Sequence, residues 1–161
     1  MQTTAARARE HQVVFCGLEV LRLMGERMES SHDVDSKDIG AVLKFMNEVA
    51  HRCMENTEDI LRFASMDASI ANHDRARSLF AQMNKAANAA QAGEFVSLCR
   101  SYTDLLATSI LEDRKFISRV DCDLTILSQF YEWERQVDDL ARKQGQVLHR
   151  LETKYTSPHC I

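Results

Sequence analysis

Proline and glycine are scarce in this chain, with one Pro and five Gly in 161 residues. Because β-sandwiches and β-barrels need frequent turns rich in these two residues, the composition excludes both architectures. Long apolar runs are lacking too: no window of about 18 uninterrupted apolar residues is present, so no membrane span is expected. Arg7 and Arg9 are not followed by a charge-free apolar run, so no typical secretory signal is expected.

Neither sign of charge dominates, since 20 Lys and Arg residues stand against 24 Asp and Glu residues and the formal net charge is -4. No basic tract is present, so nucleic acid is not an expected partner. The cysteines are odd in number and none of them forms a CxxC pair: Cys16, Cys53, Cys99, Cys122 and Cys160. Without a signal peptide they are expected to be reduced thiols of a cytoplasmic protein. A zinc or iron–sulfur site built from scattered cysteines stays open as an alternative.

What the sequence does have is apolar residues at helical spacing over long segments. Helices are predicted over residues 4–28, 37–63, 70–91, 94–119 and 123–155. Asp35 or Ser36 is expected to cap the second of these helices, and Gly93 is expected to end the third in a left-handed conformation. We therefore predict one all-α domain over residues 1–155, followed by a flexible tail over 156–161. Its architecture is expected to be an up-down-up-down four-helix bundle with an additional C-terminal helix, which packs outside one end of the bundle or mediates association.

Ligand-type side chains fall on the apolar faces of the first four predicted helices: His11, Glu58, His73 and Asp113. Facing helices of a bundle project ligands to one point, so one His or carboxylate on each helix indicates a metal site. Two buried carboxylates need a positive charge nearby, and two imidazoles complete a mixed shell suited to iron, manganese or zinc. The alternative is that these four side chains bind no metal and are solvated or form ion pairs. Glu58 would then pair with His51, and Asp113 would pair with Arg77.

Segments of the chain resemble the motifs of hemerythrin-like (HHE cation-binding) domains, in the same order and over about residues 8 to 135. Phe45 to Phe63 resembles the second helix of that family, in which an Arg-Cys-His-His-x-x-Glu-Glu core is followed by Leu-Phe. Asn72-His73 and Arg77 resemble the third-helix pattern Glu-His-x-x-Gly-Arg. Glu10-His11 resembles the first-helix Glu-His, and Tyr102 to Phe116 resembles the fourth helix with its His-x-x-x-Glu/Asp motif.

The resemblance implies a hemerythrin-like fold with a non-haem di-iron centre. In that family one carboxylate from the second helix and one from the fourth bridge the two irons, and histidines come from all four helices. Carried over to this chain, Glu58 and Asp113 are the carboxylates, and His11 and His73 are the histidine ligands.

The chain departs from the family pattern at the ligand positions themselves. Met54 stands where the second helix has a His, and Ser109 stands where the fourth helix has one. Arg77 replaces a further third-helix His of the oxygen carriers. Because a thioether and a hydroxyl are poor ligands for iron, and because Arg77 opposes a second cation, the ordinary di-iron centre is in doubt.

We expect a non-haem metal-binding protein that holds one or two iron ions in a variant site. Its expected role is sensing, storage or stress response involving iron, dioxygen or nitric oxide, rather than catalysis. His51 or Glu55 could fill an altered metal shell. A different cofactor could instead be held through Met54 or Cys53.

The remaining alternative is a metal-free helical bundle that acts as an interaction or regulatory module. A homodimer through the C-terminal helix would suit this alternative, because that helix has an apolar stripe with charged flanks. The stripe comprises Trp133, Val137, Leu140, Val147, Leu148 and Leu151.

Overall fold

The computed structural model describes residues 2–30, 33–117 and 124–156, and it describes side chains for 13–30, 33–116, 132, 135, 136, 139 and 142–156. Within these residues every regular element is helical, which confirms the all-α prediction. The elements are α1 (Gln2–Glu29), α2 (Ser36–Phe45), a π-helical turn η1 (Met46–Ala50), α3 (His51–Phe63), α4 (Asp67–Asn88), α5 (Ala92–Ile117) and α6 (Leu124–Thr156). The expected tail over 156–161 lies almost wholly outside this description. No helix of the described residues is long and apolar enough to cross a membrane.

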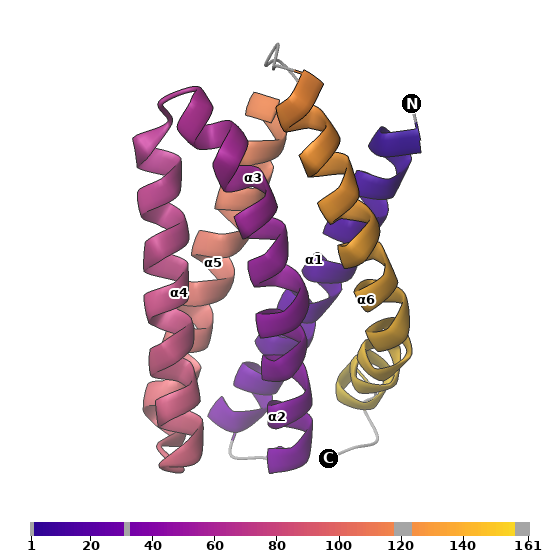
Figure 1. Ribbon diagram of the computed structural model, residues 1–161. Helices are drawn as coiled ribbons and strands as arrows, with labels where there is room; N and C mark the ends of the chain where they lie inside the picture. Colours follow the sequence, from indigo (N-terminus) through magenta and orange to yellow (C-terminus); the bar gives the residue numbers. More distant parts are fainter. Residues whose placement is uncertain (1, 31–32, 118–123, 157–161) are drawn as a thin grey trace.

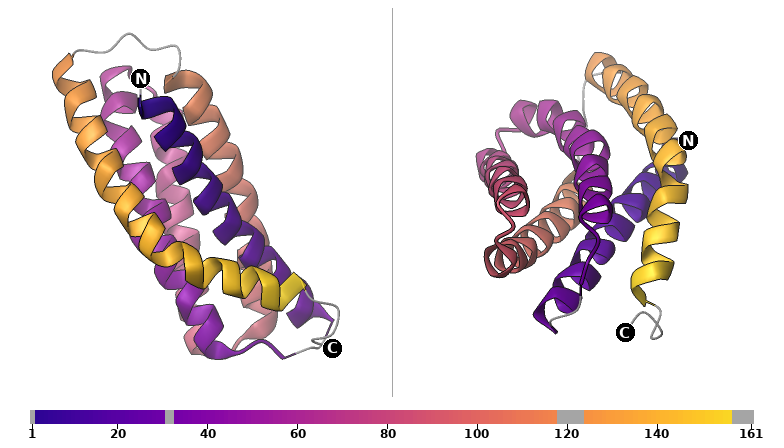
Figure 2. Two further views of the ribbon diagram at one scale, coloured as in Figure 1. Left: turned by 90° about the vertical axis from the view of Figure 1, so that its right-hand side faces the viewer. Right: turned by 90° about the horizontal axis from the view of Figure 1, so that it is seen from below.

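The long helices lie side by side, and the chain reverses direction from one helix to the next (Figure 1). The segment α2–η1–α3 forms one continuous rod, which corresponds to the single helix predicted over 37–63. Helix α4 packs against α5, and α1 packs between α5 and α6, while α3 contacts both α4 and α6. Figure 2 shows α6 running beside α1 and bending part-way along its length.

The helix ends follow local backbone chemistry, with one difference from expectation. Asp35 caps α2 as predicted, because its side chain accepts a hydrogen bond from the backbone N–H of Lys37 at 2.9 Å. The prediction for Gly93 was wrong, since Gly93 lies in the first turn of α5 and no glycine in the structure has a positive φ. Ala90 adopts the left-handed conformation instead, at φ 53°. Its neighbour Gln91 then donates its backbone N–H back to the carbonyl of Ala86 at 3.0 Å, which ends α4 without a glycine.

The C-terminal part of α6 belongs to the core, rather than only packing outside one end as expected. Leu148, Leu151 and Tyr155 are buried in the same cluster as the apolar side chains of α1 and α2. Val147 is 38% exposed. The other members of the expected association stripe, Trp133, Val137 and Leu140, lie outside the described side chains. Two residues of that stripe, Leu148 and Leu151, are therefore used inside the molecule.

A group of charged and polar contacts, the α2–α6 clasp, joins the first turn of α2 to the last turns of α6. The buried carboxylate of Asp38 accepts hydrogen bonds from Lys154 Nζ at 2.6 Å and from the Tyr155 hydroxyl at 2.7 Å. Arg150 lies 3.8 Å from the other carboxylate oxygen. Arg27 of α1 donates to the backbone carbonyls of Lys154 and Tyr155, which lie at the C-terminal end of α6.

Gly17 sets how closely α1 approaches α2 and η1. A Cβ atom at Gly17 would lie 2.7 Å from Cε1 of Phe45 and 2.9 Å from Sδ of Met46. Phe45 is buried, at 1% exposure, so its ring cannot turn out into solvent without leaving the core. We predict that Gly17→Ala lowers the free energy of unfolding by about 1–2 kcal/mol, because overpacking outweighs the gain in helix propensity. Urea unfolding followed by circular dichroism measures this.

Gly40→Ala is the matched control for this substitution. Gly40 is also helical, but a Cβ atom there would meet nothing within 4 Å. It should raise the free energy of unfolding by about 0.5–1 kcal/mol through helix propensity alone. Equal effects of the two substitutions would show that α1 does not approach Phe45 as closely as described.

The clasp makes stability depend on pH. Burial by itself raises the pKa of Asp38, but the hydrogen bonds from Lys154 and Tyr155 outweigh it, so the pKa lies below its ordinary value. A lowered pKa stabilises the fold above the unfolded-state pKa, and this contribution is lost as pH falls through the folded-state value. We predict that Asp38→Asn lowers the melting temperature at pH 7 and that the difference from the parent shrinks steadily below about pH 4. A constant difference down to pH 2, in thermal scans across that range, would contradict the assignment.

Candidate metal centre

Three of the predicted ligand residues come together in the interior. His73 of α4 lies between Glu58 of α3 and Asp113 of α5, with exposed fractions of 1%, 6% and 6%. Its Nδ1 is 3.2 Å from Oε1 of Glu58, and its Nε2 is 2.6 Å from Oδ2 of Asp113. The backbone of His11 lies in α1, but its side chain is outside the described part of the chain, so its place relative to this cluster is not described.

Helical spacing accounts for the positions of these side chains. Residues four apart share a helix face, so Glu58 lies one turn from Met54, and Asp113 lies one turn from Ser109. Both Met54 and Ser109 are buried, at 2% and 3% exposure. Met54 and Ser109, where the resemblance to hemerythrin-like domains implies histidines, thus lie on buried faces together with the two carboxylates.

The buried carboxylates have partners within the protein. Each ring nitrogen of His73 faces one of them, Nδ1 facing Glu58 and Nε2 facing Asp113. Arg77 also donates from Nη2 to Oε1 of Glu58, and Arg62 Nη2 lies 3.5 Å from its other oxygen. Without such partners an isolated buried carboxylate would be very costly. Positive charge for Glu58 is therefore supplied within the chain.

The ion pairs differ from the alternative pairs considered from the sequence. Arg77 pairs with Glu58, not with Asp113, and the partner of Asp113 is His73. Arg62 was not anticipated, although its position four residues after Glu58 on the same helix is a usual spacing for an ion pair.

His51 belongs to a second buried polar pair rather than to Glu58. Its Nε2 is 3.1 Å from the hydroxyl of Tyr102, and its ring meets the ring of Phe80 edge-on at 4.6 Å. Burial, followed by the charge of Arg77, lowers the pKa of His51 to about 4, so its ring is neutral at pH 7. Burial also raises the pKa of the Tyr102 hydroxyl, which stays protonated. The sequence does contain a signal for this pair. His51 lies seven residues before Glu58, and Tyr102 lies seven residues before Ser109, so each shares a helix face with a buried polar residue.

Two buried oxygen atoms on α5 lack a hydrogen-bond partner. They are Oγ of Ser109 and Oδ1 of Asp113, which lie one turn apart on α5, and both are buried. Among the described side chains, Nδ2 of Asn56 is the only other buried polar atom without a hydrogen-bond partner. An unsatisfied buried polar group costs about 1–3 kcal/mol, so native proteins usually supply a partner such as a water or an ion. The Ser109–Asp113 face of the cluster is therefore where an added ligand would be bound.

The donor set fits one cation better than two. Carboxylate, imidazole and hydroxyl groups suit iron, manganese or zinc. Among the described residues, however, no group of three or more His, Cys, Asp or Glu side chains is placed to hold a metal ion. The two nitrogens of His73 face different carboxylates. A second cation near Glu58 would also meet the charge of Arg77.

The described cysteines do not extend this cluster. Cys16 donates its thiol to Glu152 of α6 at 2.8 Å, and burial together with this carboxylate raises its pKa to about 12. Burial raises the pKa of Cys99 to about 12 as well. Protonated thiols are poor metal ligands and nucleophiles, so neither residue has the chemistry of a reactive site. Cys122 and Cys160 lie outside the described residues.

Comparisons with protein-family models, curated proteins and solved structures give no match to this chain. The resemblance to hemerythrin-like domains is carried by the motifs of the sequence alone.

Ser109 provides a direct test of the unpaired oxygen. In metal-free protein, Ser109→Ala removes a buried hydroxyl without a partner, so we predict a gain in the free energy of unfolding of about 1 kcal/mol. Asp113→Asn should lower the free energy of unfolding by about 2–4 kcal/mol, because it removes the carboxylate that faces His73. Chemical denaturation in the presence of a chelator measures both. A loss of stability in Ser109→Ala would mean that the hydroxyl has a partner.

Proposed function

We propose that this protein is a hemerythrin-like helical bundle that binds one non-haem metal ion, iron, in a variant site. The observation that carries the proposal is the pair of unsatisfied buried oxygens one turn apart on α5, one on Ser109 and one on Asp113, whose other oxygen contacts His73. Asp113 and Nε2 of His73 are the proposed ligands on this side, with His11 as the ligand expected from α1. Bound iron would supply a coordination position for a small ligand.

Glu58 has a positioning role in this proposal. It holds Nδ1 of His73 by a hydrogen bond, which fixes the ring and directs Nε2 toward Asp113. A carboxylate behind a metal-binding histidine is a common arrangement that orients the ring and increases its basicity. Arg77 fixes Glu58 in turn, which supports one metal ion rather than a bridged pair.

Burial of the cluster supports dioxygen or nitric oxide as the small ligand. His73 is 1% exposed, so a bulky substrate has no direct access to it. We accordingly propose a role in sensing, storage or stress response involving iron, oxygen or nitric oxide, rather than turnover of a larger substrate. The protonated thiols of Cys16 and Cys99 are compatible with the proposed cytoplasmic location.

The metal assay tests this proposal. Untagged protein from iron-replete cells should contain about one iron per chain, and iron affinity should rise with pH because metal ligands bind in their deprotonated form. Asp113→Asn should lower the iron content at least about tenfold, since it removes a charged ligand. Asp104→Asn is the matched control, because Asp104 is an exposed acidic residue on the same helix. Elemental analysis with a visible absorption spectrum gives the readout.

Less than about 0.2 iron per chain, with no change on Asp113→Asn, would overturn the proposal.

The alternative is a metal-free bundle that serves as an interaction or regulatory module. A specific observation favours it: Arg77 pairs with Glu58 and His73 contacts both carboxylates, so each buried carboxylate already has a partner without a bound cation. A melting temperature that does not respond to added iron would support this alternative. A homodimer through α6 would then have to use residues other than Leu148 and Leu151, which are buried within the chain.

A further inference from the structure

Two adjoining cavities lie along the seam between the rod α2–η1–α3 and helix α4. One has a volume of about 410 Å³ and lies at α2, and the other has a volume of about 560 Å³ and lies at η1 and α3. Asn47 and Phe80 line both of them, and the two cavities together are called the seam groove. Each volume falls within the range of small-molecule sites, about 300–1,000 Å³. This seam groove lies outside the His73 cluster, and Arg77 touches both.

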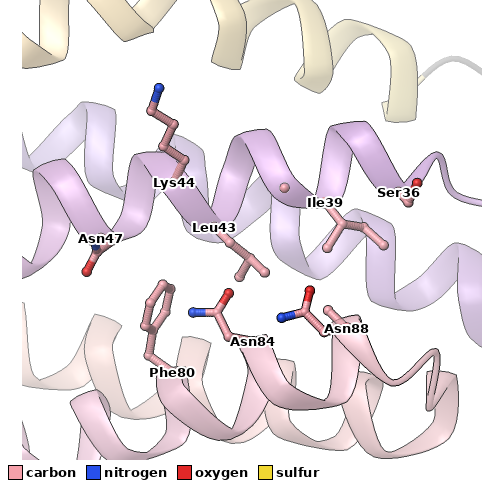
Figure 3. A pocket seen from close by; sticks show the side chains of 10 residues that line it. Ser36, Ile39, Leu43, Lys44, Asn47, Phe80, Asn84 and Asn88 are labelled. Atoms are coloured by element: carbon pink, nitrogen blue, oxygen red, sulfur yellow. The ribbon is translucent and has the colours of Figure 1, made fainter.

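The α2 half of the seam groove combines an apolar base with carboxamides (Figure 3). Ile39 and Leu43 supply apolar surface from α2. Asn84 and Asn88, one turn apart on α4, point toward α2, and Asn47 faces them from the other side (Figure 3). Each carboxamide carries a donor and an acceptor, and none of the three is hydrogen-bonded to a described residue. Such groups match the edge of a flat heterocycle that has donors and acceptors of its own, as Asn does with adenine.

The α3 half of the seam groove carries two guanidinium groups. Arg52 is exposed and forms no ion pair or hydrogen bond with any residue that the structure describes. The Arg77 side chain is 31% exposed and keeps donors to spare, since its contacts with Glu58 and Asp74 use two of five N–H groups. Guanidinium groups match phosphate and carboxylate oxygens in geometry as well as charge. Glu55 is the one acidic residue that lines this cavity.

We propose that the seam groove binds a nucleoside monophosphate or a close analogue. The phosphate lies between Arg52 and Arg77, and the base lies past Phe80 along Asn47, Asn84 and Asn88. The ligand is a single nucleotide rather than a nucleic acid, because the net charge of -4 and the lack of a basic tract do not suit a polyanion.

The test is calorimetric titration of the full chain with adenosine, guanosine, cytidine and uridine 5′-monophosphates. A chelator is present throughout, so the result does not depend on metal binding at His73. Arg52→Gln should weaken binding of the best nucleotide about tenfold, because it removes a charged contact to phosphate. Glu55→Gln should tighten binding, because it removes a negative charge beside the same phosphate. Asn88→Ala should weaken binding several-fold without changing the affinity for inorganic phosphate.

Arg75→Gln is the matched control, since Arg75 is exposed on α4 two residues from Arg77 and lines neither cavity. All four positions are exposed, and circular dichroism of each variant checks the fold. Dissociation constants above the order of 1 mM for all four nucleotides would overturn the proposal. It would also be overturned if inorganic phosphate bound as tightly as the best nucleotide, or if Arg75→Gln weakened binding as much as Arg52→Gln.

Discussion

The buried contact of His73 with two carboxylates is the constraint on which the interior of this protein depends. It joins α4 to α3 through Glu58 and to α5 through Asp113. A buried carboxylate that loses its partner costs several kcal/mol, so none of these three helices can slide or rotate without breaking a contact that has no substitute nearby. The apolar core fills the space between the helices, and this contact adds a buried polar link among α3, α4 and α5.

The same groups explain why a metal-binding cluster and a metal-free cluster are competing proposals. Arg77 already supplies positive charge to Glu58, and a bound cation would add positive charge beside Asp113. A metal at Nε2 of His73 would replace the contact of that atom with Asp113, whereas Arg77 acts on the far side of the ring through Glu58. Any metal affinity of this site is thus linked to pH and to the charge on Arg77. Because Arg77 also lines the seam groove, the interior cluster and the surface groove are physically connected through one side chain.

Polar contacts are concentrated at a second place as well, where α6 meets the bundle. Asp38 and Arg27 fix the end of α6, and Leu148 and Leu151 fill the core beside them. A charged helix that looked peripheral in the sequence is therefore part of the single core. Its apolar residues are too widely spaced along a charged surface for sequence periodicity to show whether they pack within the chain or against another molecule.

Helical periodicity and composition were sufficient to predict the all-helical class, the approximate extent of each helix, the Asp35 cap and the burial of Glu58, His73 and Asp113. These are local properties, because a spacing of three or four residues determines which face a side chain shares. The end of α4 was mispredicted for a local reason too: Gly93 was the favoured residue for a left-handed turn, but hydrogen bonding from Gln91 to Ala86 lets Ala90 adopt it.

Only the tertiary structure decided which buried groups are partners. The sequence allowed Glu58 to pair with His51, and Asp113 with Arg77, whereas in the fold His51 binds Tyr102 and His73 lies between the two carboxylates. Spacing within one helix does not set the rotation of that helix against its neighbours or the distance between them. Those quantities come from packing, including the close approach at Gly17 and the placement of α6, so the partners of each buried charge follow from the fold as a whole.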